Sequence, residues 1–174
     1  MSVLRKYILY LGLMLGLLNL GYAQRYAMQF QQCYGGSSGD VGKDIFLLPD
    51  STFLIFAGTA SQDGTVSYNH GDSDFWLLKT DNTGVLIWEK TFGGGDTESR
   101  KNMKITTEGD FVMSGYTQSN NGDVSGNHGG FDYWVVKTDE QGNLLWQRCL
   151  GSSVNDLALQ MKLDDEDNIY VIGE

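Results

Sequence analysis

The chain has 174 residues, of which 41% are hydrophobic and 20% charged, with two cysteines and one proline. This length fits one ordinary domain and excludes two large ones, and two cysteines exclude a disulfide-rich scaffold. Acidic residues outnumber basic residues by 22 to 12, which gives a formal net charge of −10. Such a surface repels phosphate backbones and anionic lipids, so the composition argues against binding of nucleic acids or membrane surfaces.

The first 23 residues have the three parts of a secretory signal peptide. Arg5 and Lys6 form a short basic region, residues 7–18 are apolar, and residues 21–23 place small residues at the cleavage position. As a helix, the apolar region spans about 18 Å, which is less than the roughly 30 Å of a bilayer's hydrocarbon core. We therefore predict export with cleavage of residues 1–23, a secreted or cell-surface location, and no stable membrane insertion.

A 58-residue repeat occupies most of the remaining chain. When the sequence is shifted by 58, residues 64–88 fall on residues 122–146 with 14 of 25 positions identical. The similarity continues at residues 93–115 and 151–173, and residues 28–35 match residues 144–151 two periods later.

These matches divide the sequence into five parts. They are the signal peptide (1–23), the last strand of a preceding or closing blade (24–35), repeat 1 (36–92), repeat 2 (93–150) and the first half of repeat 3 (151–174). A complete third repeat requires 34 more residues, because 58 minus the 24 present leaves 34. We therefore expect an unfinished array.

Each period predicts four short β-strands. In repeat 1 these are residues 45–48, 53–59, 75–80 and 86–92. The third strand is apolar on both faces, as expected between two packed sheets, whereas in the fourth we expect Leu86, Trp88 and Phe92 on one face. Residues 27–34 have the character of an outer strand that closes a ring of blades, and no segment has a helical period.

A four-stranded unit repeated at a fixed period is typical of a β-propeller blade. We therefore predict an all-β fold of four-stranded antiparallel blades repeated every 58 residues, forming a partial β-propeller, with a β-helix as the alternative. The positions that both repeats share are interpreted as structural. They are Asp74, Trp76, Lys79, Asp81, Gly84 and Trp88 in repeat 1, and Asp132, Trp134, Lys137, Asp139, Gly142 and Trp146 in repeat 2.

Three strings of repeat 2 carry a family resemblance. They are residues 132–139 (DYWVVKTD), 142–147 (GNLLWQ) and 121–130 (NGDVSGNHGG). They resemble the propeller-type repeats of secreted Bacteroidota proteins associated with type IX secretion, and the resemblance extends over residues 30–173. It implies a secreted propeller repeat protein and is uninformative about activity. Many members end in a C-terminal sorting domain, which this sequence does not contain, so we interpret the chain as truncated.

Five residues are candidates for metal binding. His70 and His128 occupy the same repeat position, and the loops around them carry Asp63, Asn120 and Asp123. Imidazole nitrogens are common zinc ligands, and side-chain oxygens suit calcium. The oxygen spacing differs from that of an EF-hand loop, so we expect Asn-His-Gly to fix the shape of each loop. We predict no cofactor, with calcium as the open alternative.

The other reactive or aromatic residues form no converging catalytic set. Residues 35–39 match the G-x-S-x-G pattern but lie between predicted strands, whereas a nucleophile elbow needs a strand, a turn and a helix. Cys33 and Cys149 lie two periods apart on the expected polar faces of their strands, and we predict two unpaired thiols. Tyr68 and Tyr116 are the loop aromatics that suit stacking on a sugar ring.

The sequence therefore predicts an exported, non-catalytic interaction module with an unspecified protein or glycan partner. The alternative is a fragment of a propeller enzyme or glycan-binding protein whose site lies on blades outside this sequence. A third interpretation is a complete short chain that closes its blades by self-association.

Overall fold

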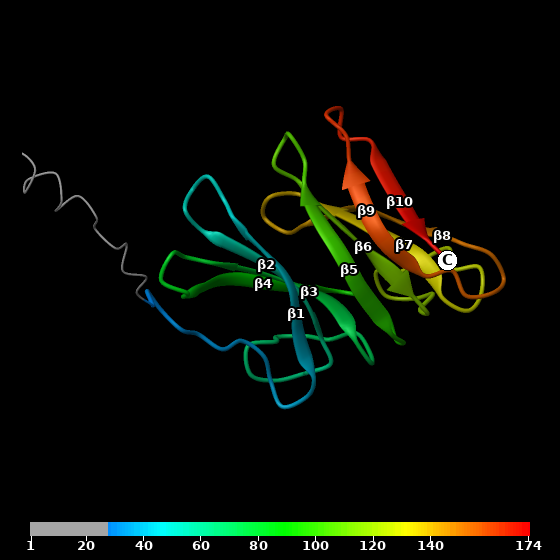
Figure 1. Ribbon diagram of the computed structural model, residues 1–174. Helices are drawn as coiled ribbons and strands as arrows, with labels where there is room; N and C mark the ends of the chain where they lie inside the picture. Colours follow the sequence, from blue (N-terminus) through cyan, green and yellow to red (C-terminus); the bar gives the residue numbers. More distant parts are fainter. Residues whose placement is uncertain (1–27) are drawn as a thin grey trace, which may run out of the picture.

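The computed structural model describes residues 28–174, which form three antiparallel β-sheets without an α-helix (Figure 1). The all-β prediction is therefore confirmed, while the predicted signal peptide lies outside the described residues. Within residues 28–174, no helix has the length and apolar character needed to cross a membrane.

The first two sheets have four strands each, and the third has two. Sheet 1 contains β1 (Asp40–Leu47), β2 (Phe53–Thr59), β3 (Asp74–Thr80) and β4 (Leu86–Phe92). Sheet 2 contains β5 (Glu98–Ile105), β6 (Phe111–Thr117), β7 (Asp132–Thr138) and β8 (Leu144–Leu150). Sheet 3 contains β9 (Ala158–Leu163) and β10 (Ile169–Gly173).

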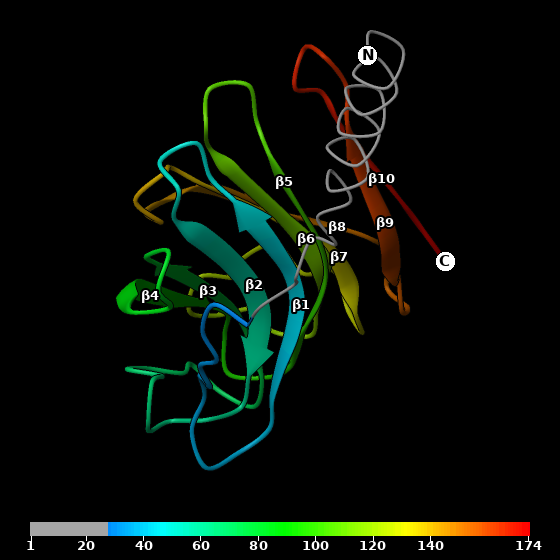
Figure 2. The same cartoon turned by 60° about the vertical axis from the view of Figure 1, so that its left-hand side comes forward.

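The sheets follow one another in chain order, and both views place sheet 2 between sheet 1 and sheet 3 (Figures 1 and 2). Each four-stranded sheet is a meander in which every strand pairs with the next one along the chain. The prediction of four-stranded antiparallel units is thus confirmed for two periods. The described residues form a stack and no closed ring, so the propeller stays a prediction.

The first strand of each four-stranded sheet is longer than the sequence pattern predicts. β1 begins at Asp40, five residues before the predicted start, and pairs there with Thr59. A register shift between Gly42 and Asp44 interrupts the pairing, and β5 has the same irregularity between Arg100 and Asn102. Such a bulge breaks the two-residue alternation by which a strand is identified in a sequence.

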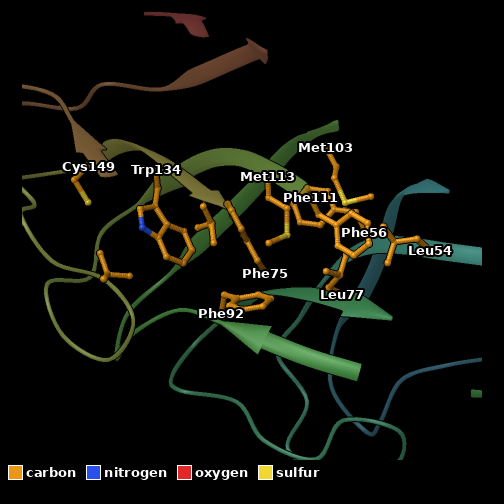
Figure 3. Close-up of a cluster of buried hydrophobic side chains, with 12 residues drawn as sticks. Leu54, Phe56, Phe75, Leu77, Phe92, Met103, Phe111, Met113, Trp134 and Cys149 are labelled. Atoms are coloured by element: carbon orange, nitrogen blue, oxygen red, sulfur yellow. The ribbon is translucent and has the colours of Figure 1, made fainter. Parts of the chain in front are cut away.

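The main apolar core lies between sheets 1 and 2 (Figure 3). Trp134 of β7 is fully buried there, and its ring centroid lies 4.7 Å from that of Phe75 on β3. Phe92 completes the contact at the end of β4 and is 4% exposed. Burial of these rings removes large apolar areas from water and holds the two sheets together.

The prediction that the third strand is buried on both faces is confirmed. In β3, Phe75 and Leu77 face sheet 2, while Trp76 and Leu78 belong to a second cluster on the opposite face of sheet 1. In β7, Val135 faces sheet 3, opposite to the side that holds Trp134. Sheets 1 and 2 thus each contribute their two faces to two different apolar layers.

The predicted face of Leu86 is wrong. Trp88 and Phe92 pack against the core between sheets 1 and 2, whereas Leu86 packs against the cluster on the other face. The cause is a register shift in the β3–β4 ladder between Lys79 and Thr80. One residue inserted into an alternating strand reverses the face of every residue beyond it.

The tight connection between the third and fourth strands forms as predicted. The carboxylate of Asp81 accepts the backbone N–H groups of Thr83 and Val85 at 2.8 and 2.9 Å. Gly84 has a φ of 84°, a conformation that side chains with a Cβ disfavour. Asp139 and Gly142 repeat the arrangement in sheet 2, where Gly142 has a φ of 78°.

Residues 28–34 are not in a strand, although residues 27–34 are predicted to form one. Phe30 nevertheless lies against Gly84, where an added Cβ would be 2.7 Å from its ring. One period later, Trp88 lies against Gly142 in the same way, 3.1 Å from the equivalent Cβ position. Phe30 therefore contacts Gly84 of sheet 1 in the way that Trp88 of β4 contacts Gly142 of sheet 2, although residues 28–34 form no strand.

Candidate functional site

A carboxylate marks the start of each sheet at intervals of one period. Asp40 and Glu98 are the first residues of β1 and β5, and Asp156 precedes β9. Each accepts a hydrogen bond from the N–H group four residues earlier, which belongs to the loop entering the sheet. Asp156 accepts the N–H and the hydroxyl of Ser152 at 2.7 and 3.0 Å. We call these contacts the carboxylate clamps.

In sheet 1 the clamp carboxylate accepts several hydrogen bonds. Asp40 accepts the N–H of Gly36 at 2.8 Å and the hydroxyl of Ser61 at 2.8 Å, and it also accepts the hydroxyl of Thr59. Burial alone raises the pKa of Asp40, but these hydrogen bonds outweigh it and hold the pKa below its usual range. The carboxylate is therefore ionised across the neutral range.

In sheet 2 the clamp is more deeply buried. Glu98 is fully buried and accepts the N–H of Gly94 at 2.8 Å and the hydroxyl of Thr117 at 2.6 Å. Here the effect of burial exceeds that of the hydrogen bonds, so the pKa of Glu98 is raised. The nearby charge of Asp74 raises it further. The same clamp therefore has opposite pKa shifts in the two sheets.

The two histidines each pair with an aspartate at the start of a third strand. His70 Nδ1 lies 2.6 Å from Asp74 Oδ2, and His128 Nδ1 lies 2.6 Å from Asp132 Oδ2. His70 also reaches the next repeat, with Nε2 at 3.4 Å from Asp123 Oδ2. The structure thus uses the imidazoles to fasten loops, in keeping with the shape-fixing interpretation of Asn-His-Gly.

Two buried carboxyl groups crowd around Gly93 at the junction of sheets 1 and 2. A Cβ added at Gly93 would lie 2.3 Å from Asp74 Oδ1 and 2.4 Å from Glu98 Oε2. Asp74 Oδ1 is buried and has no hydrogen-bond partner. Burial raises the pKa of Asp74 as well as that of Glu98. Because two adjacent buried charges are costly, the uncharged form of each carboxyl group is favoured more strongly here than in water.

The three predicted oxygen ligands have structural hydrogen bonds. Asp63 accepts the N–H of Ser37 at 2.7 Å, and Asn120 accepts the N–H of Gly126 at 3.1 Å within its own loop. Asp123 accepts the N–H of Gly93 at 3.3 Å. In the part of the chain that the structure describes, no three His, Cys, Asp or Glu side chains are placed to hold one metal ion.

The G-x-S-x-G segment is a loop that enters β1. The N–H groups of Ser37 and Ser38 are held by Asp63 and Ser61, at 2.7 and 3.0 Å. A strand follows the segment, so it lacks the helix that a nucleophile elbow requires. The loop is one of the carboxylate-clamp loops, which is its evident role.

Both strand-three tryptophans are tied to the fourth strand of their own sheet. Trp76 donates its indole N–H to Glu89 Oε2 at 2.7 Å, and Trp134 donates to Gln147 Oε1 at 2.9 Å. The acceptors lie at the same repeat position. Each third–fourth-strand hairpin therefore carries its own partner for the tryptophan N–H.

The strand-three lysines meet an acidic residue near the turn between the first and second strands. Lys79 Nζ lies 3.0 Å from Asp50 Oδ2, and Lys137 Nζ lies 2.8 Å from Asp110 Oδ2. Hydrogen bonds from Thr52, followed by the ion pair with Lys79, lower the pKa of Asp50 to about 2. The shared lysines thus position the third strand relative to this turn.

The two cysteines are free thiols, as predicted, but one lies on the wrong face. Cys33 is exposed, whereas Cys149 is buried in the core between sheets 1 and 2. Cys149 pairs with Trp134 across the β7–β8 ladder, and paired residues share a face of the sheet. Burial raises the pKa of the Cys149 thiol to about 12.

A polar pocket of about 390 Å³ lies beside the loop that carries Tyr68. Tyr68 is 60% exposed, and its ring meets that of His70 edge-on at 4.7 Å. Glu89, Asp123 and Asn143 line the same pocket. Tyr116 was predicted to be a loop aromatic, but it lies in β6 and packs on Phe131.

A groove of about 650 Å³ lies between sheet 2 and β10. On the sheet 2 side it is lined by Tyr133, Trp146 and Leu150, and on the other side by Tyr170 and Ile172. Both β10 residues are more than half exposed, and Leu150 is 50% exposed. Apolar side chains gathered around an open groove mark a surface that another element can cover.

The groove does not follow from the positions that both repeats share. Trp146, which the sequence predicts to be structural, is 37% exposed and lines the groove, whereas its equivalent Trp88 packs against the core. The available signal was the 58-residue shift itself. It places Tyr133 and Leu150 on Phe75 and Phe92, two residues that sheet 2 covers, whereas Leu150 is 50% exposed.

No protein-family model matches the chain. Among curated proteins, the regulatory protein FlaEY of Caulobacter vibrioides is 23% identical over 158 residues. The matched region covers 83% of this chain and 16% of that protein, so the chain spans a small part of the relative's length.

Proposed function

We propose that this protein is an exported, non-catalytic interaction module built from β-propeller-type repeats like those of secreted Bacteroidota proteins. The supporting observation is that its polar and apolar side chains have different roles. The polar residues that recur every 58 positions bind one another within and between sheets, whereas the apolar residues of the last sheets line an open groove.

The recurring polar residues support a structural role. The carboxylate clamps hold the entering loops, the histidine–aspartate pairs hold the long loops, and the lysines hold the turns. Catalysis needs a nucleophile, a base and a stabilising group directed at one point in space. Here the groups that have this chemistry point at neighbouring backbone or at one another.

The stacking geometry supports the propeller part of the proposal. Sheets 1 and 2 have the same strand order and the same clamp, and the segment around Phe30 takes the place of a preceding fourth strand. Stacked units of this kind bury their apolar faces only against a neighbour.

Export and lack of catalysis can be tested with the full chain carrying a C-terminal tag in a Gram-negative host. We expect the chain in the extracytoplasmic fraction, with an intact mass that lacks residues 1–23. The double variant Arg5→Glu, Lys6→Glu is the control and should stay in the cytoplasm. An uncleaved chain in the cytoplasm would contradict export, and turnover of polysaccharide by the purified chain would contradict a non-catalytic role.

A second candidate function is glycan binding at the polar pocket. An exposed tyrosine ring beside carboxylate and amide groups is an arrangement that binds sugars, and Tyr68 provides it. The test is a glycan array probed with the full chain and with Tyr68→Ala. Tyr116→Ala is the matched control, because Tyr116 lies in β6, packs on Phe131 and does not line the pocket. Binding that survives Tyr68→Ala would exclude the pocket.

A further inference from the structure

The turns that join the first two strands of each sheet lie one after another at the same end of the stack (Figures 1 and 2). They are residues 48–52, 106–110 and 164–168, which are spaced by one period. Between the turns of sheets 2 and 3, Asp167 accepts the backbone N–H and the hydroxyl of Thr107 at 3.0 and 2.6 Å. This contact fastens the two turns to each other.

The equivalent contact cannot form between the turns of sheets 1 and 2. One period before Thr107 stands Pro49, which has no backbone N–H, and one period before Asp167 stands Gly109, which has no carboxylate. Pro49 and Gly109 instead line a pocket of about 530 Å³, a volume typical of sites that bind small organic groups. All the lining residues belong to sheets 1 and 2 or to their turns, and both of these sheets have four strands. The pocket therefore results from two positions at which the repeats differ.

Much of the pocket lining is apolar. Phe111 of β6 is 1% exposed, and Leu48 and Ile105 are partly buried against the main core between sheets 1 and 2. Leu47 and Pro49 add apolar surface from the first turn. An apolar group that fills this space therefore loses contact with water, which favours binding.

The charged part of the lining is mainly acidic. It contains the carboxylates of Asp50, Glu108 and Glu140 and one ammonium group, that of Lys79. Lys79 Nζ lies 3.0 Å from Asp50 Oδ2, so this cation is already paired. Among residues 28–174, no lysine, arginine or histidine forms an ion pair with Glu108 or Glu140. Two uncompensated carboxylates thus border an apolar space.

We propose that this pocket binds an organic cation, namely an ammonium or guanidinium group carried on an apolar body. The cation pairs with Glu108 and Glu140, while the apolar body packs on Ile105 and Phe111. Such a cation occurs on free amines and on the basic side chains of partner proteins, and the test separates these two sources. The inference goes beyond the proposed function and does not depend on export or on the lack of catalysis.

Other classes of ligand fit the pocket less well. An anion would meet three carboxylates, and the ammonium group of the lining is held by Asp50. A bare metal ion needs several ligand atoms at close range, whereas no three acidic side chains of the described residues are placed to hold one. A neutral apolar ligand gains no ion pair, and this difference can be measured.

The first test titrates the full chain with 2-phenylethylamine and follows the backbone amide resonances by NMR spectroscopy. The matched neutral probe is 2-phenylethanol, which has the same ring and carbon chain without the charge. We expect saturable shifts at residues 47–50 and 105–111, with a dissociation constant on the order of 1 mM for so small a ligand. The neutral probe should bind about fivefold more weakly or worse.

A second pair of probes identifies the source of the cation. The capped dipeptide of phenylalanine and arginine represents a partner protein, and the capped dipeptide of phenylalanine and citrulline is its neutral counterpart. Tighter binding of the arginine dipeptide than of 2-phenylethylamine assigns the site to a partner's side chain, and the reverse order assigns it to a free amine. Either order supports the site. Equal binding by the charged and neutral members of both pairs would overturn it.

Substitutions in the chain test the two glutamates. Glu108→Gln and Glu140→Gln should each weaken binding of 2-phenylethylamine about threefold, because each removes one charge and leaves the shape of the pocket unchanged. Glu166→Gln is the matched control, since Glu166 stands one period after Glu108 and does not line the pocket. It should leave binding within about 1.5-fold. Equal effects of all three substitutions would contradict the proposed ion pairs.

The double variant Pro49→Thr, Gly109→Asp gives the first junction the two residues that fasten the second. A Cβ added at Gly109 meets nothing within 4 Å, and Asp167 adopts a φ of 61° at the equivalent position. We expect this variant to be folded by circular dichroism and to show no saturable shifts. Binding at wild-type strength by the folded variant, or shifts of the wild type centred outside the pocket, would overturn the proposal.

Discussion

The interface of sheet 1 with sheet 2 and the interface of sheet 2 with sheet 3 are built from the same repeat and differ in completeness. At the first, Phe75 is fully buried and Phe92 is 4% exposed. At the second, the equivalent of Phe92 is Leu150, which is 50% exposed. The chemistry of these positions is alike, so their burial is decided by whether a neighbouring sheet supplies its third and fourth strands.

The carboxylate clamps of sheets 1 and 2 also differ, in the direction of their pKa shifts. Burial raises the pKa of both groups, but the hydrogen bonds to the partly exposed Asp40 together outweigh it, whereas at the fully buried Glu98 they do not. A position that has the same role in both repeats can therefore have its pKa lowered in one sheet and raised in the other, depending on its surroundings.

The largest expected effect is at the complete interface. Trp134→Ala should lower the free energy of unfolding by about 3–5 kcal/mol, because it opens a cavity where the ring meets Phe75. Trp146→Ala, at the incomplete interface, should cost about 1 kcal/mol or less, since Trp146 is 37% exposed. Urea unfolding measures both, and equal losses would contradict the difference between the interfaces.

A second test concerns the crowded junction between the sheets. Gly93→Ala should cost about 2 kcal/mol or more, because its Cβ would fall within 2.4 Å of two buried carboxyl oxygens. Gly42→Ala is the control, since nothing lies within 4 Å of its Cβ position, and it should change stability by about 0.5 kcal/mol or less. Thermal unfolding of the two variants distinguishes a packed junction from a loose one.

The pH dependence of the two clamps should have opposite signs. The folded-state pKa of Glu98 is raised, so its contribution to stability is present below its ordinary value of 4.5 and is lost as the pH rises through the folded-state pKa. The wild type should therefore lose stability relative to Glu98→Gln between pH 4.5 and neutrality. Denaturant titrations across this range provide the measurement.

For Asp40 the pKa is lowered, so its contribution is present above its ordinary value of 3.8 and is lost as the pH falls below it. The advantage of the wild type over Asp40→Asn should therefore shrink only in acid. Parallel pH profiles for the two variants would contradict the assignment of burial as the dominant influence on Glu98.

The smallest expected effect is at the lysine pairs. Lys137→Gln should cost up to about 1 kcal/mol and Lys79→Gln less, because Asp110 is 19% exposed while Asp50 is 54% exposed. Added salt should reduce both losses. A larger loss at Lys79 would contradict the view that shielding from water sets the strength of these pairs.

Much of the fold was predictable from the sequence alone. The 58-residue period, three of the four strands of each repeat and the Asp–Gly turns follow from local patterns, namely alternation, β-branched residues and turn residues that act through their own backbone. The start of β1 and the face of Leu86 were not predictable, because bulges interrupt the alternation and depend on the partner strand.

The candidate sites depend on tertiary structure more than the strands and turns do. The sequence singled out His70 as a candidate nitrogen ligand and Asp123 as a candidate oxygen ligand. Only the stacking of the sheets shows that the two contact each other and that Asp123 accepts the N–H of Gly93. The burial of Cys149 and the exposure of Leu150 likewise depend on which sheet lies opposite. Secondary structure follows from each residue's own backbone preferences and neighbours in the chain, whereas burial, pKa and open grooves follow from what distant segments bring into contact.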